Sequence, residues 1–277
     1  MKLIPISAGN FHCDGGALFS VIPKKLWNKV YPANEDNFTL LSLRCLLVDS
    51  GEKKILIESG IGNHFTEKYF QNNGYVPGNY LEESLQKNGY SMDEITDVFF
   101  SHLHWDHCSG AVKNENGIMK LAFPNANYWC SKTQWEHSQV SNAREKAAYH
   151  NDVLNFLFDS GRMTLVESEG NLFPNMEVRF YDGHTPGQMI PFINYKGKTV
   201  IYMSDLIPTS ANIPLLWLAS YDLYPVKTLE EKEIFLIEAA KKGHVLFFEH
   251  DYFTECATVL KNNKGFQAKY KFSLNEL

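Results

Sequence analysis

Three histidines and an aspartate lie within six positions in the segment HLHWDH, residues 102–107, directly after the apolar run at 98–100. His102 and His104 are two residues apart, so in an extended backbone both imidazoles point to the same side and can bind one ion. Asp106 and His107 follow where the chain should turn, and they offer an oxygen and a nitrogen to a neighbouring ion. A polar loop with hydrogen-bonded histidines is the alternative for any one of them. Four such donors at one strand end would be costly without a cation.

The same pattern, an apolar strand that ends in a ligand-type residue, recurs in VRFYDGHTPGQ, VIYMSDLIPT and VLFFEHDYF. These segments place His184, Asp205 and His250 at the ends of three further strands. Taken singly, a histidine or aspartate in such a place usually caps the backbone. Together with the first cluster, they give seven donors from four strand ends.

Seven donors exceed the four of a closed tetrahedral zinc site, and they suit two ions that share one ligand and keep open positions for water and substrate. The expected ligands are His102, His104 and His184 for the first ion, Asp106, His107 and His250 for the second, and Asp205 as the bridge. A carboxylate suits the bridge because each of its two oxygens can face one cation. Nitrogen and oxygen ligands favour Zn(II), and they also accept Mn(II), Co(II) or Fe(II).

The hydrophobic pattern predicts the elements that position these donors. Strand-like runs rich in β-branched and aromatic residues span 38–50, 53–59, 96–101, 126–131, 176–181, 189–195, 198–204 and 244–250. Helical patterns lie between them at 79–90, 142–160 and 228–243, the last starting at Thr228. Tight turns and helices both connect strands, which predicts mixed sheets with helices on their outer faces. We therefore expect an α/β layered sandwich, formed as a single domain over residues 1–277.

The composition of the chain argues against some classes of partner. The chain of 277 residues is 44% hydrophobic, which suffices for a large core, and its formal charge of -6 without long single-sign runs makes nucleic acid an unexpected partner. Its five scattered cysteines indicate reduced thiols. No apolar run reaches the length of a signal peptide or membrane helix, so we expect a cytoplasmic protein without a membrane partner. Edge strands and exposed aromatic residues are compatible with a homodimer.

The order HxHxDH, then a separate histidine, an aspartate and a last histidine, resembles the signature of the metallo-β-lactamase superfamily. The resemblance covers nearly the whole chain and implies an αββα four-layer sandwich with two mixed sheets and a dinuclear site along one edge. The segments DGGALFSVIPKKLWNKVYP, SDLIPT and PLLWLASYDLYP are similar to the branch of quorum-quenching N-acyl-homoserine lactonases. Those lactonases carry a substrate-contacting tyrosine three residues after the bridging aspartate. This chain has Pro208 there, with Tyr221 or Tyr224 as candidate replacements.

The expected reaction is hydrolysis, in which metal-bound hydroxide attacks the carbonyl of a lactone or ester. The first candidate substrate resembles an N-acyl-homoserine lactone. Asp106 is the expected catalytic residue, because it would bind the second ion and orient or receive the proton of the nucleophile. Aromatic and apolar residues near the ligands indicate a cleft for a small molecule with an apolar portion. The expected substrate-contacting residues are Phe11, Asp14, Trp105, Leu206, Ile207, Trp217, Tyr221 and Tyr224, with Asp14 in a tight loop with Gly15 and Gly16.

Two alternatives stay open at the level of sequence. The same pair of ions suits organophosphate or phosphodiester hydrolysis. A protein of another class, a non-catalytic binding protein that uses metal only for stability, could share the fold. All seven ligand positions being filled argues against this second alternative.

Overall fold

The computed structural model describes residues 1–277, which divide into two compact units. The first unit comprises Met1–Asn10, Leu43–Glu169 and Gly187–Met189, and the second comprises Phe11–Ser42, Gly170–Pro186 and Ile190–Leu277. Each unit is built around one large sheet. The expectation of a single domain stays a prediction.

The first unit contains most of a six-stranded sheet with the order β1-β2-β3-β4-β7-β8. Its strands are β1 (Lys2–Asp14), β2 (Phe38–Asp49), β3 (Lys54–Ile57), β4 (Asp97–Phe99), β7 (Asn127–Ser131) and β8 (Met163–Val166). Strands β2 and β3 are antiparallel, whereas β3, β4, β7 and β8 are parallel neighbours. The carboxyl ends of these parallel strands therefore lie at one edge of the sheet, and the segment HLHWDH begins there, just after β4.

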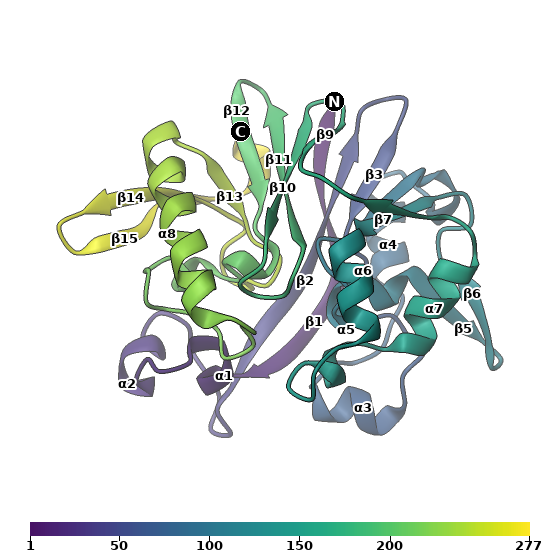
Figure 1. The fold of residues 1–277 in the computed structure, drawn as a ribbon, viewed down its shortest axis with the longest axis horizontal. Helices are drawn as coiled ribbons and strands as arrows, with labels where there is room; N and C mark the ends of the chain where they lie inside the picture. The colour runs from purple at the N-terminus through teal and green to yellow at the C-terminus, as the bar shows by residue number, and fades with distance from the viewer. The chain divides into compact units, whose positions relative to one another are not determined.

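Short elements cover this sheet. They are α3 (Glu67–Asn72), α4 (Tyr80–Lys87), η1 (Met92–Glu94), α5 (Trp105–Cys108), η2 (Ser109–Ala111), α6 (Lys132–Gln139), η3 (Lys146–Ala148) and α7 (Asn151–Asp159), together with the hairpin β5 (Val112–Glu115) and β6 (Ile118–Leu121). Helix α6 packs beside β7 and β8 (Figure 1). The expected helix at 142–160 is wrong over its first half, because only the turn η3 precedes α7 there.

The second unit contains most of a seven-stranded mixed sheet with the order β15-β14-β13-β12-β11-β10-β9. Its strands are β9 (Gly170–Phe173), β10 (Met176–Tyr181), β11 (Gln188–Tyr195), β12 (Lys198–Tyr202), β13 (Val245–Phe247), β14 (Cys256–Asn262) and β15 (Gly265–Phe272). The other elements are α1 (Gly15–Phe19), α2 (Lys24–Trp27), η4 (Ser204–Leu206), η5 (Ser210–Asn212), α8 (Pro225–Lys242) and η6 (Leu274–Glu276). Strands β12 and β13 are parallel, so their carboxyl ends share one edge.

Helix α8 forms the core of the second unit with this sheet (Figure 1). Its residues Phe235 and Leu236 pack in one buried cluster with Ile201 of β12 and Leu246 of β13. The helix begins with a proline in its first turn, three residues before the expected start, because proline needs no hydrogen-bonded N–H there. It ends at Gly243, whose φ of 66° is the left-handed conformation that glycine adopts without strain.

The expected tight loop at Asp14 is wrong. Strand β1 runs to Asp14, and the side chain of Asp14 then caps α1 by accepting a hydrogen bond of 3.0 Å from the Ala17 N–H. Gly15 is needed for packing here, since a Cβ atom at this position would lie 2.2 Å from the ring of Trp27.

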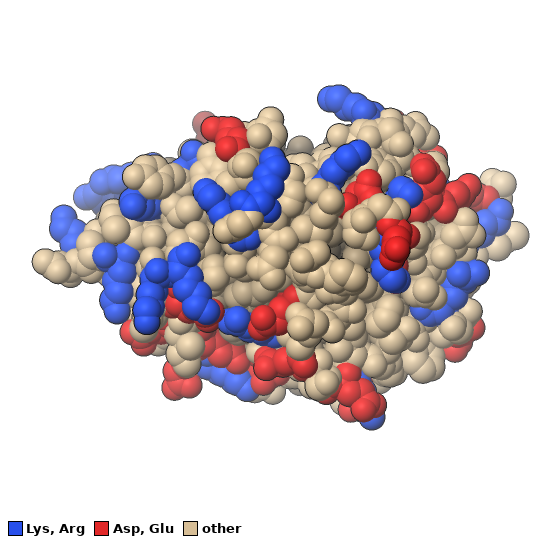
Figure 2. Space-filling view, turned by 90° about the horizontal axis from the view of Figure 1, so that it is seen from above, with Lys and Arg blue, Asp and Glu red and all other residues tan.

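Basic and acidic side chains both appear on the face shown in Figure 2, where neither sign forms a continuous surface. None of the helices combines the length and the apolar character that crossing a bilayer requires. All five cysteines are free thiols and buried.

Candidate metal centre

In the first unit, the extended segment after β4 brings two histidines together. The Nε2 atom of His102 and the Nδ1 atom of His104 are 3.0 Å apart, as the two-residue spacing predicts. Two nitrogen ligands at zinc distances in a tetrahedral site are about 3.3 Å apart, so this pair fits one ion. The other ring nitrogen of His102 contacts the Ser101 hydroxyl at 2.8 Å, which holds the ring in place.

Asp106 and His107 lie in the one-turn helix α5, which begins directly after His104. The Oδ2 atom of Asp106 is 3.7 Å from the Nε2 atom of fully buried His107. The backbone of His107 is fixed because its carbonyl accepts hydrogen bonds from the N–H and the hydroxyl of Ser59, at 2.8 and 3.0 Å. Gly110 makes this close approach possible, since a Cβ atom on it would lie 2.0 Å from the Ser59 carbonyl oxygen.

Glu58 is a buried residue of this site that the sequence analysis missed. Its carboxylate accepts a hydrogen bond of 2.9 Å from the Ser101 N–H and lies 3.7 Å from His107 Nδ1. Glu58, His102 and His107 each bring one possible ligand atom within 4.8 Å of the others. The residue has a φ of 64°, a strained conformation for glutamate that its side-chain contacts help to hold. The signal was present, because Glu58 ends the apolar run of β3 as the other donors end theirs.

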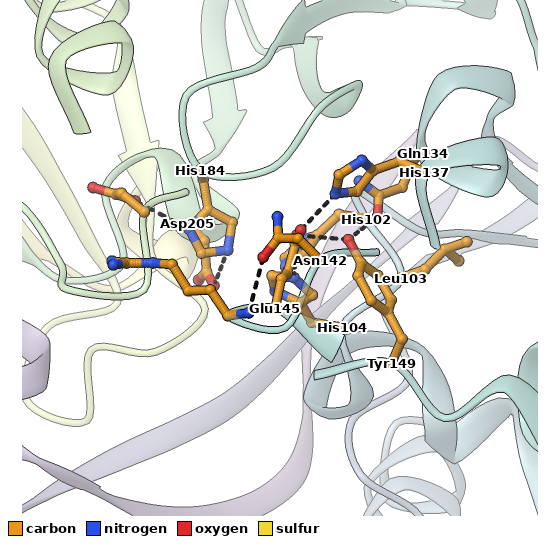
Figure 3. A network of polar contacts seen from close by, with 12 residues as sticks. His102, Leu103, His104, Gln134, His137, Asn142, Glu145, Tyr149, His184 and Asp205 are labelled. Atoms are coloured by element: carbon orange, nitrogen blue, oxygen red, sulfur yellow. Dashed lines mark hydrogen bonds and ion pairs between the residues drawn. The ribbon is translucent and has the colours of Figure 1, made fainter. Parts of the chain in front are cut away.

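In the second unit, Asp205 lies between two histidines. Its Oδ2 atom is 3.2 Å from His184 Nε2, and its Oδ1 atom is 3.1 Å from His250 Nε2 (Figure 3 shows the first contact). Each oxygen therefore faces a different imidazole. This is the arrangement that a carboxylate bridging two ions requires.

The opposite nitrogens of the same histidines are held by other groups. His184 Nδ1 lies 3.0 Å from an oxygen of Asp222, and His250 Nδ1 lies 2.9 Å from the Ser42 carbonyl oxygen. If each Nδ1 carries the hydrogen, each Nε2 keeps its lone pair for an ion. Asp222 was missed in the sequence, because its partner His184 is 38 residues away.

The electrostatics of His184 favour a cation. Burial acts to lower its pKa, but the carboxylates of Asp205 and Asp222 outweigh burial and raise the pKa to about 10. Without metal, a proton supplies the positive charge that these carboxylates stabilise. A divalent ion satisfies the same demand, so the donor set of the second unit fits a metal.

Of the apolar residues expected to contact substrate, Leu206 and Ile207 are buried in the core cluster with α8. The structure thus gives both of them a packing role. The ring of Phe11 lies edge-on to His250, with centroids 5.6 Å apart. Trp105 lies edge-on to Tyr69 at 5.2 Å and to Phe65 at 6.2 Å, in an aromatic cluster of the first unit.

The remaining expected contacts lie in the second unit. Trp217 packs edge-on to Phe19, with ring centroids 5.7 Å apart. Tyr221 is 53% exposed, and its hydroxyl is 3.4 Å from the Cys13 sulfur. Tyr224 is also exposed, and it immediately precedes α8. Their roles in substrate binding stay predictions.

The sequence pattern of the metallo-beta-lactamase superfamily matches residues 40–250, which include all seven expected ligands. The chain belongs to this superfamily. The family resemblance predicted from HxHxDH and the three later donors is thereby confirmed.

Individual relatives agree with this membership. The N-acyl homoserine lactonase AiiA of Bacillus thuringiensis subsp. kurstaki is 24% identical to this chain over an alignment of 278 positions. The alignment covers 90% of this chain and 93% of that protein. A probable metal-dependent hydrolase from Staphylococcus aureus has a TM-score of 0.88 and 27% identity, covering 100% of this chain and 98% of the other. The dizinc quorum-quenching lactonase AidC, solved with a product bound, has a TM-score of 0.80 and 25% identity. The match covers 99% of this chain and 95% of AidC. The expected α/β fold of the metallo-β-lactamase type is confirmed, and the chain is a metal-dependent hydrolase.

Proposed function

We propose that this metallo-β-lactamase superfamily member is a dinuclear hydrolase that opens lactones or cleaves small esters, with an N-acyl-homoserine lactone as its first candidate substrate. The observation that carries the proposal is Asp205, whose two oxygens face His184 and His250 separately. A carboxylate placed in this way has one oxygen available for each of two ions. The similarity to curated lactonases over nine-tenths of the chain supports the lactone.

The proposed ligands are those expected from the sequence. They are His102, His104 and His184 for the first ion, Asp106, His107 and His250 for the second, and Asp205 for both. Support comes from inside each unit: His102 and His104 present a pair of nitrogens, and Asp205 already contacts one histidine assigned to each ion. Zinc is the first candidate metal for such nitrogen and oxygen donors.

Two divalent ions held by these residues would supply a water of lowered pKa, about 7, and a Lewis acid for the carbonyl oxygen. Asp106 serves this chemistry as an acceptor. Its side chain is 14% exposed at the start of α5, so one carboxylate oxygen can bind an ion while the other accepts a hydrogen from the attacking water. Asp106 thereby orients the water and receives its proton.

The aromatic residues support a substrate with an apolar portion. Trp105 directly precedes Asp106 in sequence and packs against Tyr69, which places apolar surface next to the proposed catalytic carboxylate. Pro208 cannot donate a hydrogen bond to the substrate carbonyl. Tyr221 and Tyr224 are the candidate replacements, since both side chains are exposed.

A substrate panel on zinc-reconstituted protein tests this function. We expect the highest kcat/KM on N-acyl-homoserine lactones, lower values on aryl esters, and loss of all activity after chelation. Tyr221→Phe and Tyr224→Phe are measured separately, and the variant with the lower kcat/KM on the lactone identifies the replacing hydroxyl. Wild-type kcat/KM in both variants would exclude both tyrosines. Faster turnover of a nitrophenyl phosphotriester than of any lactone would instead support the organophosphate alternative.

The homodimer, the cytoplasmic location and the absence of nucleic-acid and membrane partners stay predictions from the sequence.

A further inference from the structure

Glu145 is a buried carboxylate of the first unit, 6% exposed, that no expected function explains. It lies just before the turn η3, in the segment between α6 and α7. Three side chains meet it (Figure 3). Its Oε1 atom is 3.1 Å from His104 Nε2 and accepts a hydrogen bond of 2.7 Å from the Tyr149 hydroxyl, and its Oε2 atom contacts His137 Nε2 at 2.5 Å.

The contact with His104 determines what Glu145 can do. A carboxylate only accepts, so the 3.1 Å contact requires that His104 Nε2 carries the hydrogen and donates it. In that tautomer His104 Nδ1 keeps its lone pair, and Nδ1 is the atom that lies 3.0 Å from His102 Nε2. The lone pair is thus directed to the side where the two histidines can bind one ion.

The remaining contacts keep Glu145 in one orientation. His137 and Tyr149 occupy the two oxygens, so the carboxylate cannot rotate away from His104 without breaking another hydrogen bond. Tyr149 also packs against the His104 ring, with centroids 5.1 Å apart. A charge-assisted hydrogen bond inside a buried network is stronger and more directional than one in water.

We propose that Glu145 is a positioning residue, which fixes the tautomer and ring orientation of His104 and thereby sets the affinity of one ion of the pair. The inference rests on the proposed dinuclear centre. It assigns Glu145 no contact with substrate or metal, and it gives His137 and Tyr149 the task of orienting Glu145. Removing such a partner of a metal-bound histidine typically lowers metal affinity about 10- to 100-fold.

The test is a competition between zinc-loaded protein and increasing concentrations of a chelator. Glu145→Gln keeps the shape of the side chain but offers one acceptor oxygen where the carboxylate offers two, and Glu145→Ala removes both. We expect Glu145→Ala to release one of its two zinc ions at about 10- to 100-fold lower chelator concentration than wild type, while the second ion is retained. Glu145→Gln can keep the acceptor for His104 but loses its charge, so its release should shift in the same direction by less. With Co(II) as the probe, the absorption bands of one site should change and those of the other should persist.

Asp97→Asn is the matched control. Asp97 is a fully buried carboxylate of the same unit that accepts hydrogen bonds from Lys53, Thr96 and Trp129 and contacts no expected ligand. Asp97→Asn should lower the thermal stability of the metal-free protein without changing zinc release. If Glu145→Gln behaves in the same way as this control, Glu145 is only structural and the inference is overturned.

The outcomes separate the two proposals. A wild-type protein that binds fewer than two zinc ions overturns the dinuclear function, and the inference with it. The inference about Glu145 alone is overturned if the wild type binds two zinc ions and Glu145→Gln releases both at the same chelator concentration as the wild type. Should Glu145→Ala fail to fold, the isosteric Gln variant and its Co(II) spectrum decide.

Discussion

The two units position their proposed metal donors in different ways. In the first, four donors lie within six residues, on an extended segment that leads into the one-turn helix α5. In the second, His184, Asp205 and His250 follow different strands, and Asp205 meets both histidines only because the sheet brings those strand ends together. The first set is therefore encoded locally, and the second depends on the topology of a sheet.

The carboxylates that contact the far ring nitrogens of these histidines also differ between the two units. In the first unit Glu145 divides its two oxygens among His104, His137 and Tyr149. In the second unit Asp222 contacts His184, and with Asp205 it raises the pKa of that imidazole to about 10. The Glu145 carboxylate thus contacts three side chains in the first unit, and in the second unit two carboxylates concentrate negative charge on one imidazole.

Asp205→Asn should give the largest effect, because one substitution weakens the contacts to both His184 and His250. We expect zinc content to fall below about one ion per chain and kcat/KM on the preferred substrate to drop at least about a hundredfold. Elemental analysis and steady-state kinetics measure both quantities, and circular dichroism checks the fold. His107→Ala removes a donor assigned to one ion and should leave about one zinc bound. Equal zinc loss in the two variants would contradict the bridging role of Asp205.

The comparison also explains what the sequence could predict of the site. His102 and His104 were predictable because two residues in an extended strand fix which side both imidazoles take. Glu58 carried a local signal, because it follows the apolar run of β3, whereas Glu145 carried none, because its contact with His104 lies 41 residues away. No local pattern connects such residues. Glu145 reaches His104 from the segment between α6 and α7.

The fold shows the same division. Apolar strands such as β4 and β13 were predicted because buried parallel strands are continuously hydrophobic. The hairpin of β14 and β15 was missed, since β15 is an edge strand that carries Lys269 and Lys271 and is largely exposed. The segment 142–150 has helix-forming residues, yet it forms only the turn η3. Tertiary contacts of Glu145 there oppose the local propensity.

Substitution of Lys232 tests how much a buried charge contributes to the stability of the second unit. Its buried ammonium donates to the carbonyl oxygens of Pro214, Leu215 and Trp217, at 3.0, 3.3 and 3.0 Å. Lys232→Met leaves these carbonyls unpaired and should destabilise the protein by about 1–3 kcal/mol at pH 7. Denaturant unfolding of the metal-free proteins measures this. An unchanged midpoint would show that the loop at 213–217 does not depend on the lysine.

The pH dependence of this difference has a defined sign. Burial lowers the pKa of Lys232 to about 7, and the Asp222 carboxylate opposes the shift only in part. Between about pH 7 and the ordinary lysine pKa of about 10.4, the unfolded chain therefore binds more protons at this residue than the folded chain does. The wild type should gain stability relative to Lys232→Met as pH rises through this window, by at most about 1.4 kcal/mol per pH unit. A constant difference between pH 7 and pH 9 would mean that the carbonyls keep the ammonium charged.

Substitution of His64 gives the smallest expected effect. The pKa of His64 is shifted in the direction opposite to that of His184. Burial lowers the pKa of His64 to about 4, and the nearby Asp152 carboxylate only partly opposes this. No carboxylate is paired with His64 as Asp222 is with His184. Between about pH 6.5 and pH 4 the unfolded chain therefore binds the additional proton, and this contribution to stability is lost on acidification. His64→Phe keeps a planar ring beside Phe65, whose centroid lies 4.2 Å from that of His64. Between pH 7 and pH 5 its thermal midpoint should fall less than that of wild type, by a few degrees. An identical fall would show that His64 has the same pKa in the folded and unfolded states, so that burial does not lower it.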